Sequence, residues 1–316
     1  MNAHRTFAAV LAAAAAFCAV AASACGGSSS GEEFPRVTTL GEGDVFPSIL
    51  NSSLGVGPNR MVLQITDRDD EQILGADVRV KLYDLNDSKP TLTAEPNVRF
   101  VPVELSYEDE QAGGERTTAG EGGAYVAYAD FDRAGDWGMK VDVERDGEQL
   151  GEAPFRFNVL QHTNEPQVGD EAPRSMQQIL ANAPDIEEID SSSPPRPQMH
   201  DVTIADAIGS GRPAVVAFAT PAFCRSRTCA PVMDTVMDPL YQKYSAQAAF
   251  IHVEPYVLRD LRASFIQNPV PAALEWQLDS EPWIFVIDGE GRIAGKFQGI
   301  VAADEVESTL RAALGA

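Results

Sequence analysis

The sequence predicts two folded parts of different class, an all-β sandwich followed by an α/β domain. Three observations support this. Between residues 61 and 160, short runs of alternating hydrophobicity are separated by polar turns and show no helical period. After residue 201, apolar runs fit for buried strands alternate with helical patterns. A stretch rich in Ser and Pro lies between them, as expected of a linker.

The first 24 residues have the features of an export signal. Arg5 precedes a long uncharged run of Ala, Val, Leu and Phe, which ends in small residues directly before Cys25. A Gly/Ser tract, typical of flexible tethers, follows Cys25. The pattern resembles a bacterial lipobox, although Ala22 stands where Leu is usual. This resemblance implies that residues 1–24 are a signal peptide, that Cys25 is lipidated, and that residues 25–36 tether the protein to the extracytoplasmic face of the cell membrane. Plain secretion and a retained transmembrane anchor are the alternatives.

The net charge of the 316 residues is −23. A nucleic acid is a polyanion and would be repelled, so the charge excludes nucleic-acid binding as a function. Export also sets the redox context, because disulfides form and persist outside the cytoplasm.

Residues 37–160 are the expected sandwich domain. Six strands are predicted, at 61–66, 77–83, 98–105, 124–131, 137–144 and 154–160. This number of short strands favours a sandwich of the immunoglobulin type. The segment that contains Tyr125 and Trp137 resembles extracytoplasmic immunoglobulin-like modules. No Cys pair lies in this part, so its stability has to come from core packing.

Residues 161–200 are predicted to be a linker, with a helix over 175–183. The α/β domain spans 201–316. Helices are expected at 202–208, 229–246 and 303–314, and strands at 214–219, 249–253, 283–288 and 292–297. Such an alternation with a late hairpin predicts a mixed sheet flanked by helices.

Two cysteines of this domain carry the main chemical signal. The chain has 4 Cys; Cys18 and Cys25 belong to the leader region, which leaves Cys224 and Cys229 as the one pair of the mature body. Two cysteines this close form a redox couple, a structural clip or part of a metal site. The strand predicted at 214–219 precedes the pair and a helix follows it.

These features, in this order, resemble the thioredoxin-like family. A buried strand delivers Cys224 at a strand-to-helix turn, the segment Glu281–Asp288 looks like the family's cis-Pro segment, and 289–299 matches its closing hairpin. The resemblance covers residues 168–316, so a segment that starts at residue 168 leads into the domain of residues 201–316. It implies a thioredoxin-like fold in which Cys224 is the nucleophile, Cys229 resolves the mixed disulfide, and Pro282 shapes the partner groove. A trans peptide bond at Pro282 is the ordinary alternative.

The residues also depart from the family pattern. The family's redox enzymes have two residues between their cysteines, whereas four separate Cys224 from Cys229. A disulfide requires Cα atoms about 4.4–6.8 Å apart, so residues 225–228 must form a loop or irregular turn, which would put Cys229 at the start of the helix. Ala217 stands where thioredoxins keep a buried acid. A helix N-terminus and the nearby Arg225 and Arg227 are expected to favour the thiolate of Cys224.

Three hypotheses follow for Cys224 and Cys229. The first is extracytoplasmic thiol–disulfide exchange with a thiol or disulfide protein, with no cofactor. The second is a structural disulfide, Cys224–Cys229, in a non-enzymatic envelope protein. The third is a copper-handling protein, similar to Sco chaperones, that uses both thiols and His252. For His252 the ordinary alternative is a strand histidine with a satisfied hydrogen bond. The partner, the direction of electron flow and the role of the sandwich do not follow from the sequence.

Overall fold

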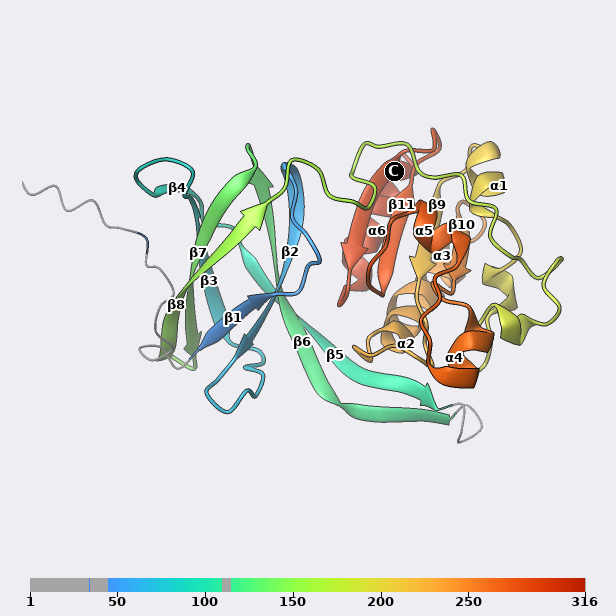
Figure 1. Cartoon of the computed structure of the whole chain (residues 1–316), viewed down its shortest axis with the longest axis horizontal. Helices are drawn as coiled ribbons and strands as arrows, with labels where there is room; N and C mark the ends of the chain where they lie inside the picture. The colour runs from blue at the N-terminus through green and yellow to red at the C-terminus, as the bar shows by residue number, and fades with distance from the viewer. Residues whose placement is uncertain (1–33, 35–44, 110–114, 316) are drawn as a thin grey trace, which may run out of the picture. The chain divides into compact units, whose positions relative to one another are not determined.

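The computed structural model describes Phe34 and residues 45–109 and 115–315 (Figure 1). The expected signal peptide and, apart from Phe34, the expected tether lie outside the described residues. All described residues belong to a single compact unit of the chain. Within these ranges, no helix combines the length and the apolar character needed to cross a membrane.

The N-terminal part consists of two four-stranded sheets in which every pairing is antiparallel. In spatial order the first sheet contains β1 (Phe46–Ile49), β2 (Gly57–Thr66), β6 (Glu115–Phe131) and β5 (Val98–Asp109); the second contains β4 (Thr91–Ala94), β3 (Asp77–Asp84), β7 (Gly135–Arg145) and β8 (Glu148–Val159). All six predicted strands are present. β1 and β4 were not predicted, because four residues are too few to establish a period of two.

The two sheets share one apolar core and therefore form a sandwich. This confirms that the N-terminal part is a β-sandwich. Alternation along β7 buries Trp137, Met139, Val141 and Val143, as a strand with one face toward a core requires. Side chains of β2, β3, β6 and β8 join the same cluster from both sheets. Burial of such side chains contributes roughly 1.5–3 kcal/mol each. The core is therefore held by packing without a disulfide.

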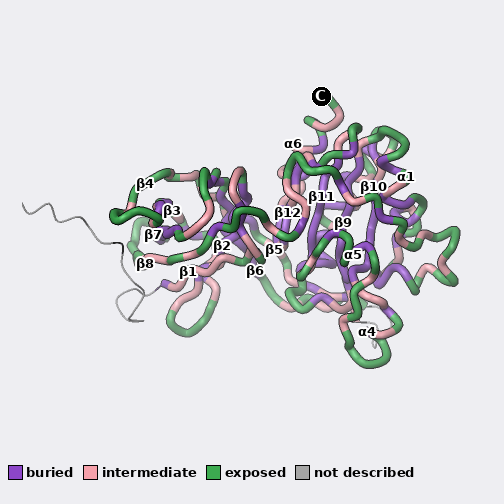
Figure 2. Tube along the Cα trace, turned by 45° about the horizontal axis from the view of Figure 1, so that its top comes forward, coloured by how far each residue is buried: buried purple, intermediate pink, exposed green. Residues whose placement is uncertain are grey.

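The C-terminal part has one mixed sheet in the order β10 (Ala249–Val253), β9 (Ala214–Phe218), β11 (Trp283–Ile287), β12 (Ile293–Gln298). β9 and β10 are parallel, whereas β11 is antiparallel to both of its neighbours. All four strands were predicted. Figure 2 shows that buried residues concentrate along β9, β10 and β11.

Helices cover both faces of this sheet. Val215 and Ala217 of β9 pack into one apolar cluster, and Val216 and Phe218 pack into another, as strand alternation requires. The first cluster includes residues of α2 (Cys229–Val232), a π-helical turn (Met233–Met237), α3 (Asp238–Tyr244) and α6 (Ala303–Ala313). The second includes residues of α1 (Ile204–Gly209) and α5 (Pro271–Glu275). A further helix, α4 (Leu258–Ser264), follows β10.

The segment predicted as a linker contains two short 3-10 helices, η2 (Ile186–Glu188) and η3 (Pro197–Met199). Some of its polar residues are buried, including Asp190, Arg196 and His200. The helix predicted over 175–183 is wrong. Its backbone forms other bonds, since the Leu180 N–H donates to the carbonyl of His200 at 2.8 Å. Tertiary hydrogen bonds have replaced helical ones here.

Candidate functional site

The loop between β9 and α2 carries Cys224, and Cys229 is the first residue of α2. Residues 225–228 form a turn, closed by a bond from the Arg227 N–H to the Cys224 carbonyl at 3.1 Å. Arg227 has a left-handed φ of 58°. The four intervening residues therefore form the irregular turn that their number predicts, and α2 starts at Cys229 as expected.

Both thiols are free and buried, with 5% of Cys224 and none of Cys229 exposed. Burial raises the pKa of Cys224, but hydrogen bonds from Cys229 and Ser226 outweigh it and lower the pKa to about 7. Burial and the neighbouring Cys224 raise the pKa of Cys229 well above its ordinary value. The backbone N–H of Cys229, the first residue of α2, also donates to Cys224 and lowers its pKa, so the helix N-terminus contributes as expected, although less than the side-chain donors.

A short chain of hydroxyl groups ends at the sulfur of Cys224. The Ser226 Oγ lies 3.1 Å from the Cys224 Sγ, and the Thr228 Oγ1 lies 2.7 Å from the Ser226 Oγ. When Thr228 donates to Ser226 and Ser226 donates to sulfur, the chain supports a thiolate. Neither hydroxyl was singled out by sequence. Their position in the four-residue segment between the two cysteines was the available signal.

A carboxyl group, Glu281, lies near both thiols and precedes Pro282. The Glu281–Pro282 peptide bond is cis, as the resemblance implies. Pro282 directly precedes β11, whose Trp283 pairs with Phe218, the last residue of β9. The strand register thus brings this segment to the end of β9 from which the cysteine loop departs.

Burial raises the pKa of Glu281, while a hydrogen bond from Tyr256 and the charge of Arg225 lower it; burial prevails. The Tyr256 hydroxyl donates to the Glu281 Oε2 at 2.6 Å. In turn the charge of Glu281 raises the pKa of Cys224 and Cys229. Ala217 is fully buried and offers no acid, so Glu281 is the carboxyl group through which a proton could move. Its place directly before the predicted cis-Pro could have identified it.

Exposed apolar side chains lie beside the loop of residues 219–228 between β9 and α2, which is called the thiol loop from here on. The ring of Phe223, directly before Cys224, meets the ring of Phe265 edge to face at 6.5 Å. Phe265 is 68% exposed, and its neighbour Ile266 is also exposed. Phe265 ends α4 in a left-handed conformation, which turns the chain and exposes the ring.

The β5–β6 hairpin also contacts the thiol loop. The Ser106 N–H donates to the Arg227 carbonyl at 3.1 Å, and the Glu108 N–H donates to the Pro221 carbonyl at 3.3 Å. The guanidinium of Arg227 lies 5.4 Å from the centre of the Tyr107 ring. These contacts fix the loop backbone on both sides of Cys224.

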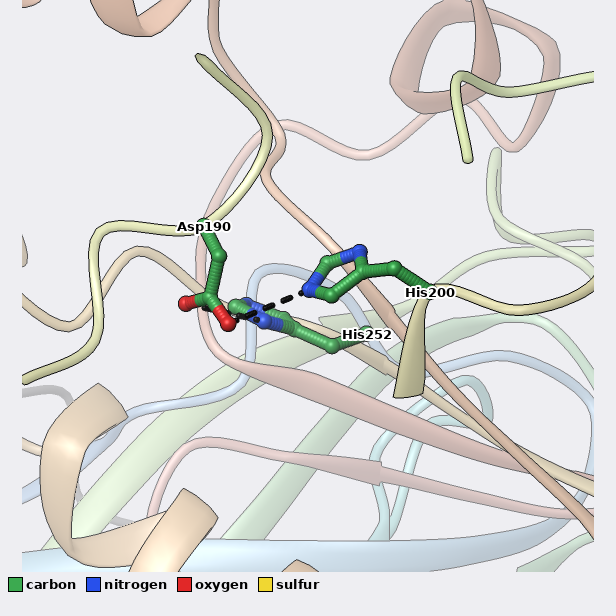
Figure 3. A group of neighbouring side chains, drawn as sticks. All are labelled: Asp190, His200 and His252. Carbon is green, nitrogen blue, oxygen red and sulfur yellow. Dashed lines mark hydrogen bonds and ion pairs between the residues drawn. The ribbon is translucent and has the colours of Figure 1, made fainter. Parts of the chain in front are cut away.

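His252 does not join the two cysteines. It lies on β10 beside Asp190 and His200 (Figure 3). Its Nε2–H donates to the carbonyl of Ala219 at 2.9 Å, the bond expected of a strand histidine. Among the described residues, the group of side chains able to hold a metal ion is Asp190, His200 and His252, without Cys224 or Cys229. The geometry thus does not favour the copper hypothesis that combines both thiols with His252.

No family model and no curated protein matches this sequence. Among solved structures, two examples are similar to part of this chain. A DUF4426 family protein from Pseudomonas aeruginosa is 15% identical, with a TM-score of 0.24, covering 41% of this chain and 100% of that one. The Lin-41 filamin domain is 11% identical, with a TM-score of 0.21, covering 37% of this chain and 93% of that one. Scores this low carry no argument about function.

Proposed function

We propose that this protein carries out thiol–disulfide exchange outside the cytoplasm, through Cys224 and Cys229. One observation carries the proposal: two free thiols lie together at the start of α2, and the Ser226 Oγ is 3.1 Å from the Cys224 sulfur, an arrangement that lowers the pKa of Cys224 to about 7 while burial raises that of Cys229. The thiolate is the attacking species in exchange, and the best attacking thiol has a pKa near the ambient pH. Cys224 meets this condition.

The proposal includes a thioredoxin-like fold for the C-terminal part. Its support is the parallel β9–β10 pair, the antiparallel β11–β12 hairpin, and a cis-Pro directly before β11. The sandwich is proposed to be immunoglobulin-like. Lettered along the chain, its sheets have the orders A-B-E-D and C′-C-F-G, and the immunoglobulin arrangement is ABED with CFG.

The exchange proceeds in two balanced steps. The Cys224 thiolate attacks a partner disulfide, which forms a mixed disulfide and releases one partner thiolate. Cys229 then loses its proton and attacks the Cys224 sulfur, which forms the Cys224–Cys229 disulfide and releases the second partner thiolate. The partner is reduced and the pair is oxidised. The reverse sequence oxidises a partner dithiol.

Glu281 is the proposed acceptor of the Cys229 proton. A buried thiol with a raised pKa attacks slowly unless a base takes its proton. Burial keeps the pKa of Glu281 raised, and the carboxyl is held by Tyr256 at 2.6 Å. This carboxyl takes over the role that the resemblance would give to an acid at position 217.

The partner is proposed to be an extracytoplasmic thiol or disulfide protein that docks on Phe265 and Ile266. Both are exposed, and Phe265 contacts Phe223 beside Cys224. Exposed apolar patches commonly mark interaction sites. Lipidation at Cys25 would hold the protein at the membrane, where such a partner could be a secreted or envelope protein.

The burial of both sulfurs favours a second candidate, a structural disulfide in a non-enzymatic protein. Cys224 is 5% exposed and Cys229 is fully buried, and structural cysteines are typically inert for this reason. The two candidates differ in what Cys224 does when Cys229 cannot resolve a mixed disulfide.

The test is therefore the variant Cys229→Ser, expressed in the native envelope and isolated under acid quench. The proposal expects mixed disulfides that disappear on reduction and that are absent from Cys224→Ser. If both variants yield the same products, or neither yields any, the exchange proposal is wrong and the structural disulfide is supported.

A further inference from the structure

Three buried side chains meet away from the thiols, and the exchange proposal gives them no role. Asp190 follows η2, His200 follows η3, and His252 lies on β10. Each is at most 2% exposed. Figure 3 shows the Asp190 carboxylate directed toward both imidazole rings. The segment predicted as a linker thus supplies two of the three groups, and the central sheet supplies the third.

The distances leave room for a shared cation. The His200 Nε2 lies 3.2 Å from the Asp190 Oδ2, and the His252 Nδ1 lies 3.5 Å from the Asp190 Oδ1. One donor atom from each of the three residues lies within 4.8 Å of the others. Zn²⁺ binds imidazole nitrogen and carboxylate oxygen at about 2.0–2.2 Å, so neighbouring donors around a tetrahedral ion lie about 3.3–3.5 Å apart. The two distances, one to each oxygen of Asp190, lie close to that spacing.

The outer contacts of His252 orient it as a ligand. Its Nε2–H donates to the Ala219 carbonyl at 2.9 Å, so Nδ1 is the nitrogen that faces Asp190. This buried Nδ1 has no hydrogen-bond partner. Metal-ligating histidines commonly donate their other N–H to a backbone carbonyl in this way. A fully buried nitrogen that makes no hydrogen bond is costly unless a proton, which would pair with Asp190, or a metal ion occupies the position it faces.

Asp190 is held in place by the backbone. Its Oδ1 accepts from the Ser192 N–H at 2.8 Å, and its Oδ2 accepts from the Arg196 N–H at 2.6 Å. The buried Glu254 lies next to this group, with its Oε1 3.9 Å from the His252 Nε2 and its Oε2 without a partner.

A cavity of about 490 Å³ gives access to this group. His200, His252 and Glu254 line it, and its lining also includes Met176, which is 72% exposed. The cavity thus reaches both imidazole residues, while Asp190 lies behind its lining. An entry path and oriented ligands are both requirements of a metal site.

We propose that Asp190, His200 and His252 form a binding site for a divalent transition-metal ion, and Zn²⁺ is the ion that we expect. Two imidazoles and one carboxylate are a common Zn²⁺ ligand set, whereas Mg²⁺ and Ca²⁺ select oxygen ligands alone. The bound ion fastens the segment that contains Asp190 and His200 to β10.

The experiment measures zinc by mass spectrometry after the purified full chain is incubated with ZnCl₂ and dialysed. We expect one zinc per chain for the wild type, for the double variant Cys224→Ser/Cys229→Ser, and for His162→Ala, an exposed histidine of the same segment. His200→Ala and His252→Ala should each lower affinity at least tenfold. The proposal is overturned if the wild type retains no zinc, if both histidine variants retain it fully, or if the cysteine variant loses it.

A second measurement does not depend on whether the variants fold. Co²⁺ in place of Zn²⁺ should give the wild type the visible bands of a nitrogen and oxygen site, without a thiolate-to-cobalt charge-transfer band. A charge-transfer band from thiolate would place the ion at Cys224 and Cys229 and overturn the proposal. An absence of visible bands, together with unchanged thermal stability in chelator and in ZnCl₂, would show that protons alone occupy the group.

Discussion

At Cys224 opposing effects act on one sulfur. Burial and the charge of Glu281 disfavour the thiolate, while donors from Cys229 and Ser226 favour it, and the donors prevail. The acidity of this thiol thus comes from its immediate neighbours. A structural clip has no need of a thiolate, so this arrangement is the main residue-level argument for exchange.

The variant Ser226→Ala tests that balance. It removes a donor 3.1 Å from the Cys224 sulfur, so the midpoint of Cys224 should rise from about 7 toward the ordinary thiol value of about 8.5. The thiolate is lost as pH falls through the midpoint, so alkylation at pH 7 should slow several-fold and recover at higher pH. The measurement is the iodoacetamide rate against pH on the reduced protein, with Ser264→Ala as the control. An unchanged midpoint contradicts the assigned cause.

The variant Glu281→Gln separates the two steps of exchange. It removes a charge that raises the pKa of both thiols, so attack by Cys224 at pH 7 should not slow. Loss of the proton acceptor should slow resolution by Cys229 by about 100-fold, and mixed disulfide should accumulate. Stopped-flow kinetics with quench and mass analysis measure both steps. Glu290→Gln, in an exposed turn, is the control. Equal slowing of both steps would count against the proposed role.

At the scale of elements, the thiol loop lies between a strand end and a helix start. The four-residue spacing forces a turn before α2, and the register of β9 with β11 brings the cis-Pro segment to the same end of the sheet. The exposed end of α4 then adds an apolar surface beside Cys224. Each contributes one part of the proposed partner site.

The variant Phe265→Asn tests the proposed partner surface. Asn tolerates the left-handed conformation that Phe265 adopts, so the backbone should keep its course while the ring is lost. We expect kcat/KM for a protein disulfide to fall about tenfold, as at a moderate hot spot, with no change for a small disulfide. Leu92→Asn, an exposed residue of β4, is the control. A similar loss for both substrates would instead indicate damage to the thiol site.

Features that depend on neighbouring residues could be predicted from the sequence, whereas contacts between distant residues could not. The strands and Cys224 could be placed because alternation and strand-to-helix order are local signals. Neither α4 nor α5 was predicted. Helix α4 ends at Phe265, where a Gly would have marked the end of a helix. Helix α5 did carry a signal that was not used, because Pro271 stands in its first turn. Ser226 and Tyr256 could not be assigned roles, since their contacts arise only from the folded chain.

The segment of residues 161–200 shows the same limit. Its content of Ser and Pro favours a solvent-exposed linker, yet Asp190 and His200 are buried. Polar residues can be buried when their hydrogen bonds are made, and here the backbone of Ser192 and Arg196 satisfies Asp190. Composition does not contain that information.

At the scale of the whole molecule, location decides which partners are available. The net charge of −23 opposes close approach to an anionic surface, and the proposed tether would hold the folded part away from it. We expect Cys25→Ser to move the protein from the membrane fraction to the soluble fraction and to abolish labelling with a fatty-acid probe. Cys18→Ser should leave both unchanged. Retention of the label in Cys25→Ser would refute lipidation at this position.

The reduction potential of the Cys224–Cys229 pair tests the central proposal most directly. It is measured by equilibrating the purified protein with glutathione buffers and trapping free thiols with acid and alkylation. Exchange proteins have potentials between about −270 and −120 mV, and we expect a value in this range. A potential below about −300 mV, which resists reduction by glutathione, would contradict exchange and identify the pair as a structural disulfide.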